Sequence, residues 1–406
     1  MKNTNMPSEE ILEKYAKVLV NFALGGGKGI KKGDVVWLRG NESCKPLYVE
    51  VYREILRKGA HIIPTYSPSE LPDLNLQKDF YQLAREHQIN FFPEHYMKGL
   101  IKQVDHMLMI LCEEDMRGLS GINSKKIMAH NHANKPFMNW RREKENLGKF
   151  SWTLALYGTE AMAREAGLST KEYWDQIIKA CFLDQADPIK KWKEVSKEID
   201  INVAKLNKLQ IETLQMQGPD ADITVKIGKD RKWEGGGGAN IPSFEIFTSP
   251  DWRGTNGWVR FNQPLYHYGD VIKGIYLEFK DGIICKATAE HNQKLLRDMI
   301  AVEGANKVGE FSMTDKRYSR ITKFMAETLY DENIGGPNGN SHLAVGMAFD
   351  ECYIGKIKLT KSGREQVGLN DSSVHTDIIT TAPRTITATL QDGTKKIIYK
   401  NGQFTI

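Results

Sequence analysis

Cysteine and long hydrophobic runs are both scarce in this sequence. Its 406 residues contain five cysteines, which are scattered along the chain and form no C-x-x-C pair. This usage predicts reduced thiols and offers no thiolate metal site. No segment comes near the roughly 20 apolar residues that a membrane-spanning helix needs, and the chain starts with an amphipathic segment instead of a signal peptide. We therefore expect a soluble, cytoplasmic protein with no membrane partner.

A strong excess of one charge is also missing. Lys and Arg total 56 against 51 Asp and Glu, which gives a formal net charge of +5, and no long basic run occurs. A dedicated nucleic-acid binder would concentrate its basic residues on one face or helix. We therefore expect no nucleic-acid partner. The 40% hydrophobic content is ample for globular cores, and the length suggests two or three domains.

The first part of the chain alternates helix-like and strand-like segments. Ser8 can cap a helix whose first turn is acidic and whose apolar residues fall on one face. The short apolar runs "DVVWLRG", "AHIIPTY" and "HMLMILC" are typical of strands buried on both faces, and amphipathic segments lie between them. This alternation predicts an α/β domain with a largely parallel sheet over residues 1–150.

The rest of the chain follows two other patterns. Residues 151–215 indicate a helical connecting block, with a capping box from Ser169 to Glu172 and Pro188 in the first turn of a long charged helix. Beyond it, alternating strands break at Asp-Gly and Asn-Gly turns, as antiparallel hairpins do. We expect an α+β domain over residues 216–406 whose antiparallel sheet carries the functional site.

The segment "VHTD" is the first candidate for that site. His375 and Asp377 are two residues apart and precede the apolar pair Ile378 and Ile379. On a strand, side chains two residues apart point to the same face. A solvated polar face is one explanation. The other is a metal ion, because neutral imidazole and carboxylate are both good metal ligands.

Three other segments place a polar group among small or apolar residues. They contain Glu245 in "NIPSFEIFTSP", Glu310 in "ANKVGEFSMTD" and His342 in "GNSHLAVGMAF". A charge in such surroundings must be paired or bound to metal. A centre that holds two cations needs four to six protein groups, with a carboxylate able to bridge the ions. Taken alone, each of these residues is more readily explained by a structural role than by metal binding.

We expect His130 and His132, in the polar segment "AHNHAN", to lie in a solvated, loop-like surface.

These motifs together resemble those of a known family. "IPSFEIFTSP", "VGEFSM", "NSHLAVGMAF" and "VHTD" are similar, in order and at similar separations, to the four metal-site motifs of the aminopeptidase T and aminopeptidase S family of metallopeptidases. Residues 159–193 also resemble the helical middle segment of that family. The resemblance covers essentially the whole chain.

The resemblance implies a homodimeric aminopeptidase that acts on short peptides with two divalent cations. It also implies an N-terminal α/β domain and a C-terminal α+β domain that carries the site. The ligands that it implies are Glu245, Glu310, His342, His375 and Asp377. Oxygen and nitrogen ligands without thiolate suit zinc, cobalt, manganese or magnesium. One of the two glutamates would bridge the ions or take the proton of the attacking water, and the sequence leaves these catalytic roles of Glu245 and Glu310 open.

Two positions depart from the family pattern. Phe244 stands where glycine usually precedes the first glutamate, which suggests a different pocket wall. Phe349 stands where the family usually has tyrosine, and phenylalanine can neither touch a metal nor stabilise an oxyanion. Tyr353 is a substitute if the segment bends. The alternatives to an aminopeptidase are a catalytically weakened metal- or peptide-binding protein on the same fold and a dinuclear hydrolase of another bond, such as a phosphoester.

Overall fold

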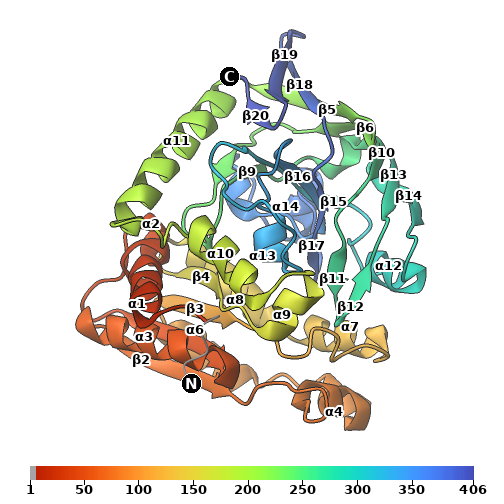
Figure 1. Cartoon of the computed structure of the whole chain (residues 1–406). Helices are drawn as coiled ribbons and strands as arrows, with labels where there is room; N and C mark the ends of the chain where they lie inside the picture. Colours follow the sequence, from red (N-terminus) through yellow and green to blue (C-terminus); the bar gives the residue numbers. More distant parts are fainter. Residues whose placement is uncertain (1–5) are drawn as a thin grey trace.

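A parallel sheet forms the N-terminal half of the protein (Figure 1). The structure is a computed structural model that describes residues 6–406. The five strands follow the order β2 (His61–Ser67), β1 (Val35–Asn41), β3 (His106–Leu111), β4 (Ser151–Leu156) and β8 (Asn240–Ile241). Val36 and Leu38 of β1 join the main core on one face, and Trp37 joins a second cluster on the other. The prediction of strands buried on both faces is therefore confirmed for β1 and β3. It is wrong for the segment "AHIIPTY", because β2 is the edge strand and most of its residues are exposed.

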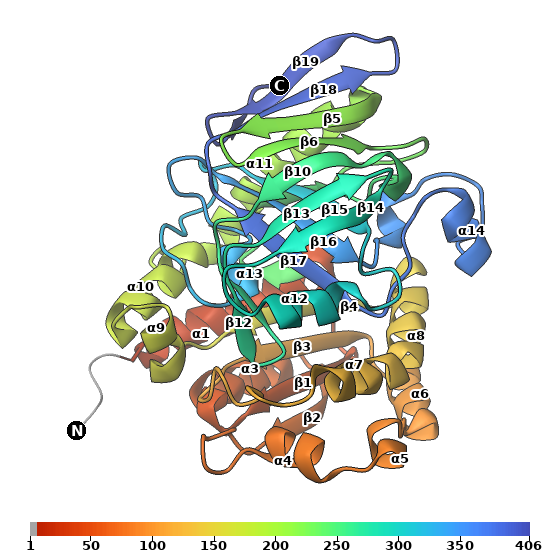
Figure 2. The same cartoon turned by 90° about the vertical axis from the view of Figure 1, so that its right-hand side faces the viewer.

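Helices cover both faces of this sheet (Figures 1 and 2). The main core contains residues of α1 (Glu9–Val18) and α3 (Lys45–Arg57), and the second cluster contains residues of α6 (Glu94–Gln103) and α8 (Lys135–Asn146). As predicted, Ser8 caps α1, because its Oγ accepts a hydrogen bond from the N–H of Ile11 at 3.4 Å. The remaining helical segments of this half are a π-helical turn (Leu19–Ala23), α2 (Leu24–Gly27), a 3-10 turn (Glu42–Cys44), α4 (Leu76–Leu83), α5 (Glu86–Ile89) and α7 (Ser124–Ala133).

The expectation of a loop around His130 and His132 is wrong. Both residues lie in α7, where the Asn123 side chain caps the helix by accepting a hydrogen bond from the N–H of Lys125. The Nδ1 atom of His130 lies 3.0 Å from the hydroxyl of Tyr81. This imidazole therefore has a structural partner outside the group of predicted metal ligands.

Three helices connect the two halves, as predicted for the middle of the chain. They are α9 (Glu160–Glu165), α10 (Thr170–Ala180) and α11 (Pro188–Lys208). Ser169 and Glu172 form the predicted capping box of α10. The Asp187 side chain caps α11, which starts at Pro188. Figure 1 shows α11 along one edge of the molecule, running from the parallel sheet towards the C-terminus.

Antiparallel sheets form the C-terminal half, as predicted. Eight strands follow the order β14 (Ile283–Thr288), β13 (Tyr276–Lys280), β10 (Asn256–Arg260), β6 (Ala221–Lys226), β5 (Ile211–Gly218), β18 (Thr385–Leu390), β19 (Lys395–Lys400) and β20 (Gln403–Phe404). Five more follow the order β17 (His375–Thr380), β16 (Asn340–Gly346), β15 (Val308–Thr314), β9 (Glu245–Thr248) and β7 (Glu234–Gly235). A small ladder pairs β11 (Leu265–His267) with β12 (Asp270–Ile272).

One face of the five-stranded sheet is apolar and belongs to the main hydrophobic core. Phe311, Leu343 and Ile378 of this sheet lie in that core, which also includes Leu214 and Ile223 of the eight-stranded sheet. The other face of the smaller sheet therefore remains for polar side chains. The helical segments around these sheets are α12 (Gln293–Ile300), α13 (Thr328–Asp331), α14 (Lys361–Gln366) and the 3-10 turns Trp252–Gly254 and Asp350–Cys352.

Strands of both large sheets lie outside the sequence segments to which the prediction assigned those sheets. The parallel sheet takes β4 and β8 from beyond residue 150, and β5 begins at Ile211, ahead of residue 216. The division into residues 1–150, 151–215 and 216–406 stays a prediction.

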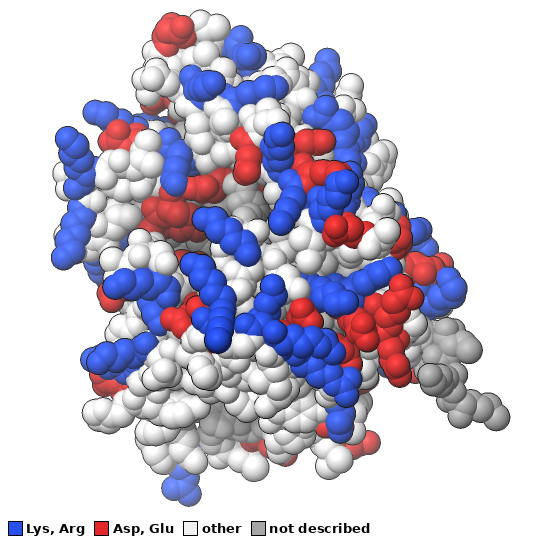
Figure 3. All heavy atoms as spheres, turned by 90° about the vertical axis from the view of Figure 1, so that its left-hand side faces the viewer, with Lys and Arg blue, Asp and Glu red and all other residues white. Residues whose placement is uncertain are grey.

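Among residues 6–406, no helix is long and apolar enough to cross a membrane. Figure 3 shows basic and acidic side chains interspersed over one face of the molecule.

Candidate metal centre

Four neighbouring strands bring the five predicted ligands to one face of the five-stranded sheet. Glu245 begins β9, Glu310 lies in β15, His342 lies in β16, and His375 and Asp377 lie in β17. The register pairs Thr314 with Glu245, Ser312 with His342, Ala344 with Asp377 and Gly346 with His375. Directly paired residues of an antiparallel ladder share a face, and so do residues two apart on one strand. The predicted alignment of His375 with Asp377 is therefore confirmed.

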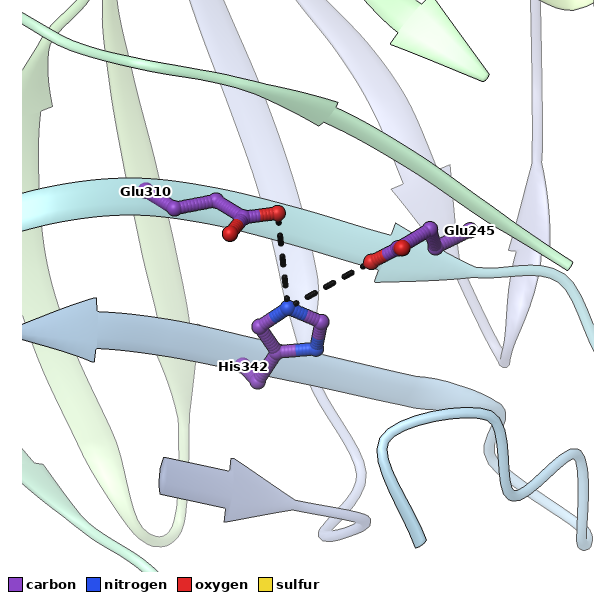
Figure 4. Close-up of side chains that lie close together, drawn as sticks. All are labelled: Glu245, Glu310 and His342. Atoms are coloured by element: carbon purple, nitrogen blue, oxygen red, sulfur yellow. Dashed lines mark ion pairs between the residues drawn. The ribbon is translucent and has the colours of Figure 1, made fainter. Parts of the chain in front are cut away.

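The side chains converge closely on this face. Figure 4 shows the carboxylates of Glu245 and Glu310 directed at the imidazole of His342. The Nε2 atom of His342 lies 3.5 Å from a Glu245 oxygen, 3.6 Å from a Glu310 oxygen and 3.7 Å from an Asp377 oxygen. The Nε2 atom of His375 lies 3.1 Å from Glu310 and 3.2 Å from Asp377. All five predicted residues thus lie in one cluster.

Glu310 is shared by two groups of potential ligands within this cluster. Ligand atoms of Glu245, Glu310 and His342 lie within 4.8 Å of one another, and so do those of Glu310, His375 and Asp377. Oε1 of Glu310 faces His342, and Oε2 faces His375. The two oxygens of one carboxylate therefore point to different imidazoles.

The surrounding hydrogen bonds leave the cluster atoms available for a cation. His375 donates from Nδ1 to the carbonyl oxygen of Met347 at 2.7 Å, which directs its Nε2 atom at the carboxylates. Ser312 donates to Oε2 of Glu245 at 2.9 Å. Oδ1 of Asp377 is buried and lies 3.2 Å from Nε2 of His375 and 3.7 Å from Nε2 of His342, but neither contact has the geometry of a hydrogen bond. Three carboxylates and two imidazoles that converge in this way fit divalent cations of moderate hardness.

Burial and mutual charge shift the pKa values of the cluster in opposite directions. Burial, followed by the charge of Glu310, raises the pKa of Glu245 to about 7. Burial alone lowers the pKa of His342, but the nearby carboxylates, Glu310 first, raise it to about 9. Burial raises the pKa of Asp377, but the charge of His375 beside it lowers the value to about 2. Without a metal ion, the cluster therefore favours charged imidazoles beside the charged carboxylates of Glu310 and Asp377, whereas Glu245 retains its proton more readily.

A cavity of about 880 Å³ lies over the cluster. Its opposite wall comes from the N-terminal half, where Leu111, Trp152 and Leu154 line it. The cavity is strongly acidic, and sequence reasoning missed these acidic groups. Outside the cluster, its carboxylates are Glu145, Glu234, Glu327, Glu332, Asp350 and Glu351, and its basic side chain among the described lining residues is Lys232.

Phe349 lies at the cavity wall beside the cluster. Its ring centroid is 4.8 Å from that of His375 and 5.6 Å from that of Phe247. Tyr353 also lines the cavity, but its hydroxyl accepts a hydrogen bond from the N–H of Ile357 at 3.4 Å. The tyrosine thus contacts its own loop.

The expectation that Phe244 forms part of the pocket wall is wrong. Its side chain is fully buried and stacks on Trp192 of α11 with a centroid distance of 5.3 Å. Glu245 points to the cavity, so the side chain before it points to the opposite face of the sheet. The aromatic ring therefore fills the core under α11 and leaves the cavity unchanged.

The arrangement agrees with comparisons against known proteins. The family model described as thermophilic metalloprotease (M29) matches residues 8–404. The chain belongs to the M29 family of metallopeptidases. It is 28% identical to aminopeptidase PepS of Streptococcus thermophilus, with 98% of both chains covered. It is 26% identical to aminopeptidase AmpS of Bacillus subtilis (strain 168), with 97% of this chain and 98% of the relative covered.

A solved structure of an M29 relative shares the fold. Wild-type AmpT from Thermus thermophilus matches with a TM-score of 0.81 and 22% identity over 98% of this chain and 100% of that chain. The solved structure therefore shares the predicted combination of α/β elements and antiparallel sheets. These matches confirm the resemblance to the aminopeptidase T and aminopeptidase S family, and they make the chain a member of a family of metallo-aminopeptidases.

Proposed function

We propose that this chain hydrolyses N-terminal residues from short peptides with a water activated by two divalent cations. The observation that carries the proposal is the position of Glu310. Its two carboxylate oxygens face two different imidazoles, His342 at 3.6 Å and His375 at 3.1 Å. One carboxylate shared between two ligand groups is what a pair of ions requires.

The five side chains divide into two sets that could each hold one ion. Glu245 and His342 belong to the first set, His375 and Asp377 belong to the second, and Glu310 belongs to both. When bound, two such ions lower the pKa of a water, polarise the scissile carbonyl and stabilise the charge that develops on its oxygen. The oxygen and nitrogen donors suit zinc, cobalt, manganese or magnesium.

This division also distributes the roles that the sequence left open between the two glutamates. Glu310 is proposed as the bridging ligand. Glu245 then remains as the proton acceptor, and the hydrogen bond from Ser312 to its Oε2 fixes the orientation of its carboxylate. The hydrogen bond from Nδ1 of His375 to the carbonyl of Met347 directs the Nε2 atom at the site, where it would bind a cation after losing its proton.

Phe349 supports a second candidate, a protein that binds metal or peptides with little turnover. A tyrosine at this position would place a hydroxyl near His375, whereas the phenylalanine ring packs against that imidazole without one. The hydroxyl of Tyr353 is engaged with Ile357. Without a tyrosine hydroxyl, the cations alone would stabilise the charge on the oxyanion.

The homodimer expected from the resemblance also stays a prediction.

The first test is peptide hydrolysis by metal-stripped protein. Amino-acid p-nitroanilides are incubated with the stripped protein alone and with added zinc, cobalt, manganese or magnesium. We expect metal-dependent release of p-nitroaniline that is lost in His375→Ala. The matched control is His132→Ala, which removes an exposed imidazole on α7.

A blocked substrate separates an aminopeptidase from other hydrolases. N-acetylated p-nitroanilides should be resistant, and p-nitrophenyl phosphate tests the phosphoester alternative. Uptake of two metal equivalents without release from any anilide would contradict the peptidase proposal and favour the binding protein. Release from the acetylated substrates at equal rates would contradict an aminopeptidase.

A further inference from the structure

Three hydrogen-bond acceptors line one corner of the cavity next to Glu245. They belong to Glu332, Asn240 and Ser243, and we call them the Glu332 corner. Glu332 is 6% exposed and lies just after α13. Asn240 lies in β8, and Ser243 lies just ahead of β9. The corner is therefore built where the parallel sheet and the five-stranded sheet meet.

Hydrogen bonds hold these acceptors in place. Asn240 donates from Nδ2 to Oε1 of Glu332 at 3.3 Å, and Asn333 donates to the same oxygen at 3.4 Å. The N–H of Phe244 donates to Oδ1 of Asn333 at 2.7 Å. This bond joins the segment before Glu245 to the segment that carries Glu332. The position of the corner relative to the cluster is therefore fixed by the backbone.

Acceptor atoms of the corner remain without donors. Oδ1 of Asn240 and Oγ of Ser243 are buried, and no hydrogen bond from residues 6–406 reaches them. Ser243 is only 5% exposed. A Cβ atom at Gly236 would collide with the hydroxyl of Ser243, so the glycine leaves room for this serine. Such buried acceptors are costly unless a ligand supplies donors.

The carboxyl group of the corner also lacks a cationic partner in the protein. Among the described residues, no Lys or Arg forms an ion pair with Glu332, whereas Lys232 pairs with Glu234 and Arg364 pairs with Asp350 elsewhere around the cavity. Glu327, a second carboxylate nearby, accepts a hydrogen bond from the N–H of Leu329 at 3.2 Å. Glu332 is therefore the carboxylate of this corner that lacks both a cation and a backbone donor.

The geometry points to the Glu332 corner as the binding site for the α-ammonium group of the substrate. A primary ammonium has three N–H donors, and the carboxylate of Glu332, the amide oxygen of Asn240 and the hydroxyl of Ser243 supply three acceptors. The corner adjoins Glu245, so an ammonium held there lies at the end of a peptide whose first carbonyl reaches the cluster. This inference rests on the proposed function and adds the residue that makes the enzyme an exopeptidase.

The test compares an amine with its desamino analogue. Binding of L-leucinol and of 4-methylpentan-1-ol to metal-loaded protein is measured by titration calorimetry, and KM and kcat for leucine p-nitroanilide are measured in parallel. We expect Glu332→Gln to reduce the preference for the amine by about tenfold or more, because a charge-assisted hydrogen bond is lost. Affinity for 4-methylpentan-1-ol should stay unchanged, and KM should rise more than kcat falls.

Two further variants complete the design. Ser243→Ala should lower the preference several-fold, and it replaces the first variant if Glu332→Gln fails to fold. The matched control is Glu54→Gln, which changes an equally buried glutamate on α3, 6% exposed, whose side chain accepts a hydrogen bond from Asn21. This control should bind both alcohols as the unmutated protein does.

The outcomes separate the subsite from the activity. Equal affinity of the unmutated protein for the two alcohols, or an unchanged preference in Glu332→Gln and Ser243→Ala, overturns the subsite. If the anilides are cleaved in that case, the proposed activity stands without it. If the preference follows the variants but no anilide is cleaved, the subsite stands and the proposed activity fails.

Discussion

The metal-free protein should lose stability between about pH 7 and about pH 9 because His342 loses its proton in that range. The imidazole is 2% exposed, and the surrounding carboxylates raise its pKa to about 9, against about 6.5 in an unfolded chain. Because the folded pKa is the higher one, the stabilisation is fully present below about pH 6.5 and disappears as the pH rises through about 9.

The size of the effect follows from the shift. The folded and unfolded pKa values of His342 differ by about 2.5, which corresponds to about 3 kcal/mol of unfolding free energy. The raised pKa of Glu245, about 7, lowers the unfolding free energy as the pH rises from about 4.3 to about 7, and this loss is complete above about pH 7. Glu332, whose pKa burial and the neighbouring carboxylates raise well above its usual range, acts in the same direction, so a variant of His342 is needed to isolate the imidazole. Bound cations require unprotonated His342, so the metal-loaded protein should show a flatter profile.

Urea unfolding of the stripped protein at several pH values between about 6.5 and about 9.5 measures this loss. The same series on His342→Gln isolates the contribution of the imidazole, and the metal-loaded protein gives the third profile. A His342→Gln profile as steep as that of the unmutated protein would refute the reasoning. So would equal slopes for the stripped and loaded proteins.

Three other substitutions test single features of the site. Phe349→Tyr should raise kcat for p-nitroanilides about tenfold or more by restoring a hydroxyl beside the reacting carbonyl, and an unchanged kcat would show that no donor is needed there. Phe244→Ala should lower the unfolding free energy by about 3–5 kcal/mol in urea, because the ring packs on Trp192, while KM stays within about twofold. Arg364→Met should lower the unfolding free energy by about 3 kcal/mol, because it removes one of the two cations that pair with Asp350 and leaves two buried carbonyl oxygens without their donor, and a loss below about 1 kcal/mol would contradict this.

The sequence predicted those parts of the site that depend on local periodicity. His375 and Asp377 align because a strand repeats every two residues, and the apolar neighbours of Glu245 and Glu310 indicated charges that must be paired or bound to metal. The same two-residue repeat also predicts the observed direction of the Phe244 side chain. If Glu245 points to the cavity, its neighbour points away.

Tertiary structure supplies the parts that the sequence could not predict. Glu332 follows a helix of four residues, and a helix this short has no periodic pattern. Its carboxylate reaches the cavity because Asn333 holds the segment against Phe244. Helix α7 was missed because only Ser124 and Ile127 of its residues are buried, so its apolar stripe is too thin to recognise.

The short strand β8 has a consequence for motion around the cavity. It pairs with β4 in the parallel sheet, and the chain then enters the five-stranded sheet at Glu245. Only residues 242–244 separate β8 from β9, so a short segment ties the two walls of the cavity together beside the candidate metal centre. Hydrogen exchange should find the amides of β4 and β9 protected together, as parts of one cooperative unit. Peptides would then enter a preformed chamber, and selection would depend on what fits through its mouth.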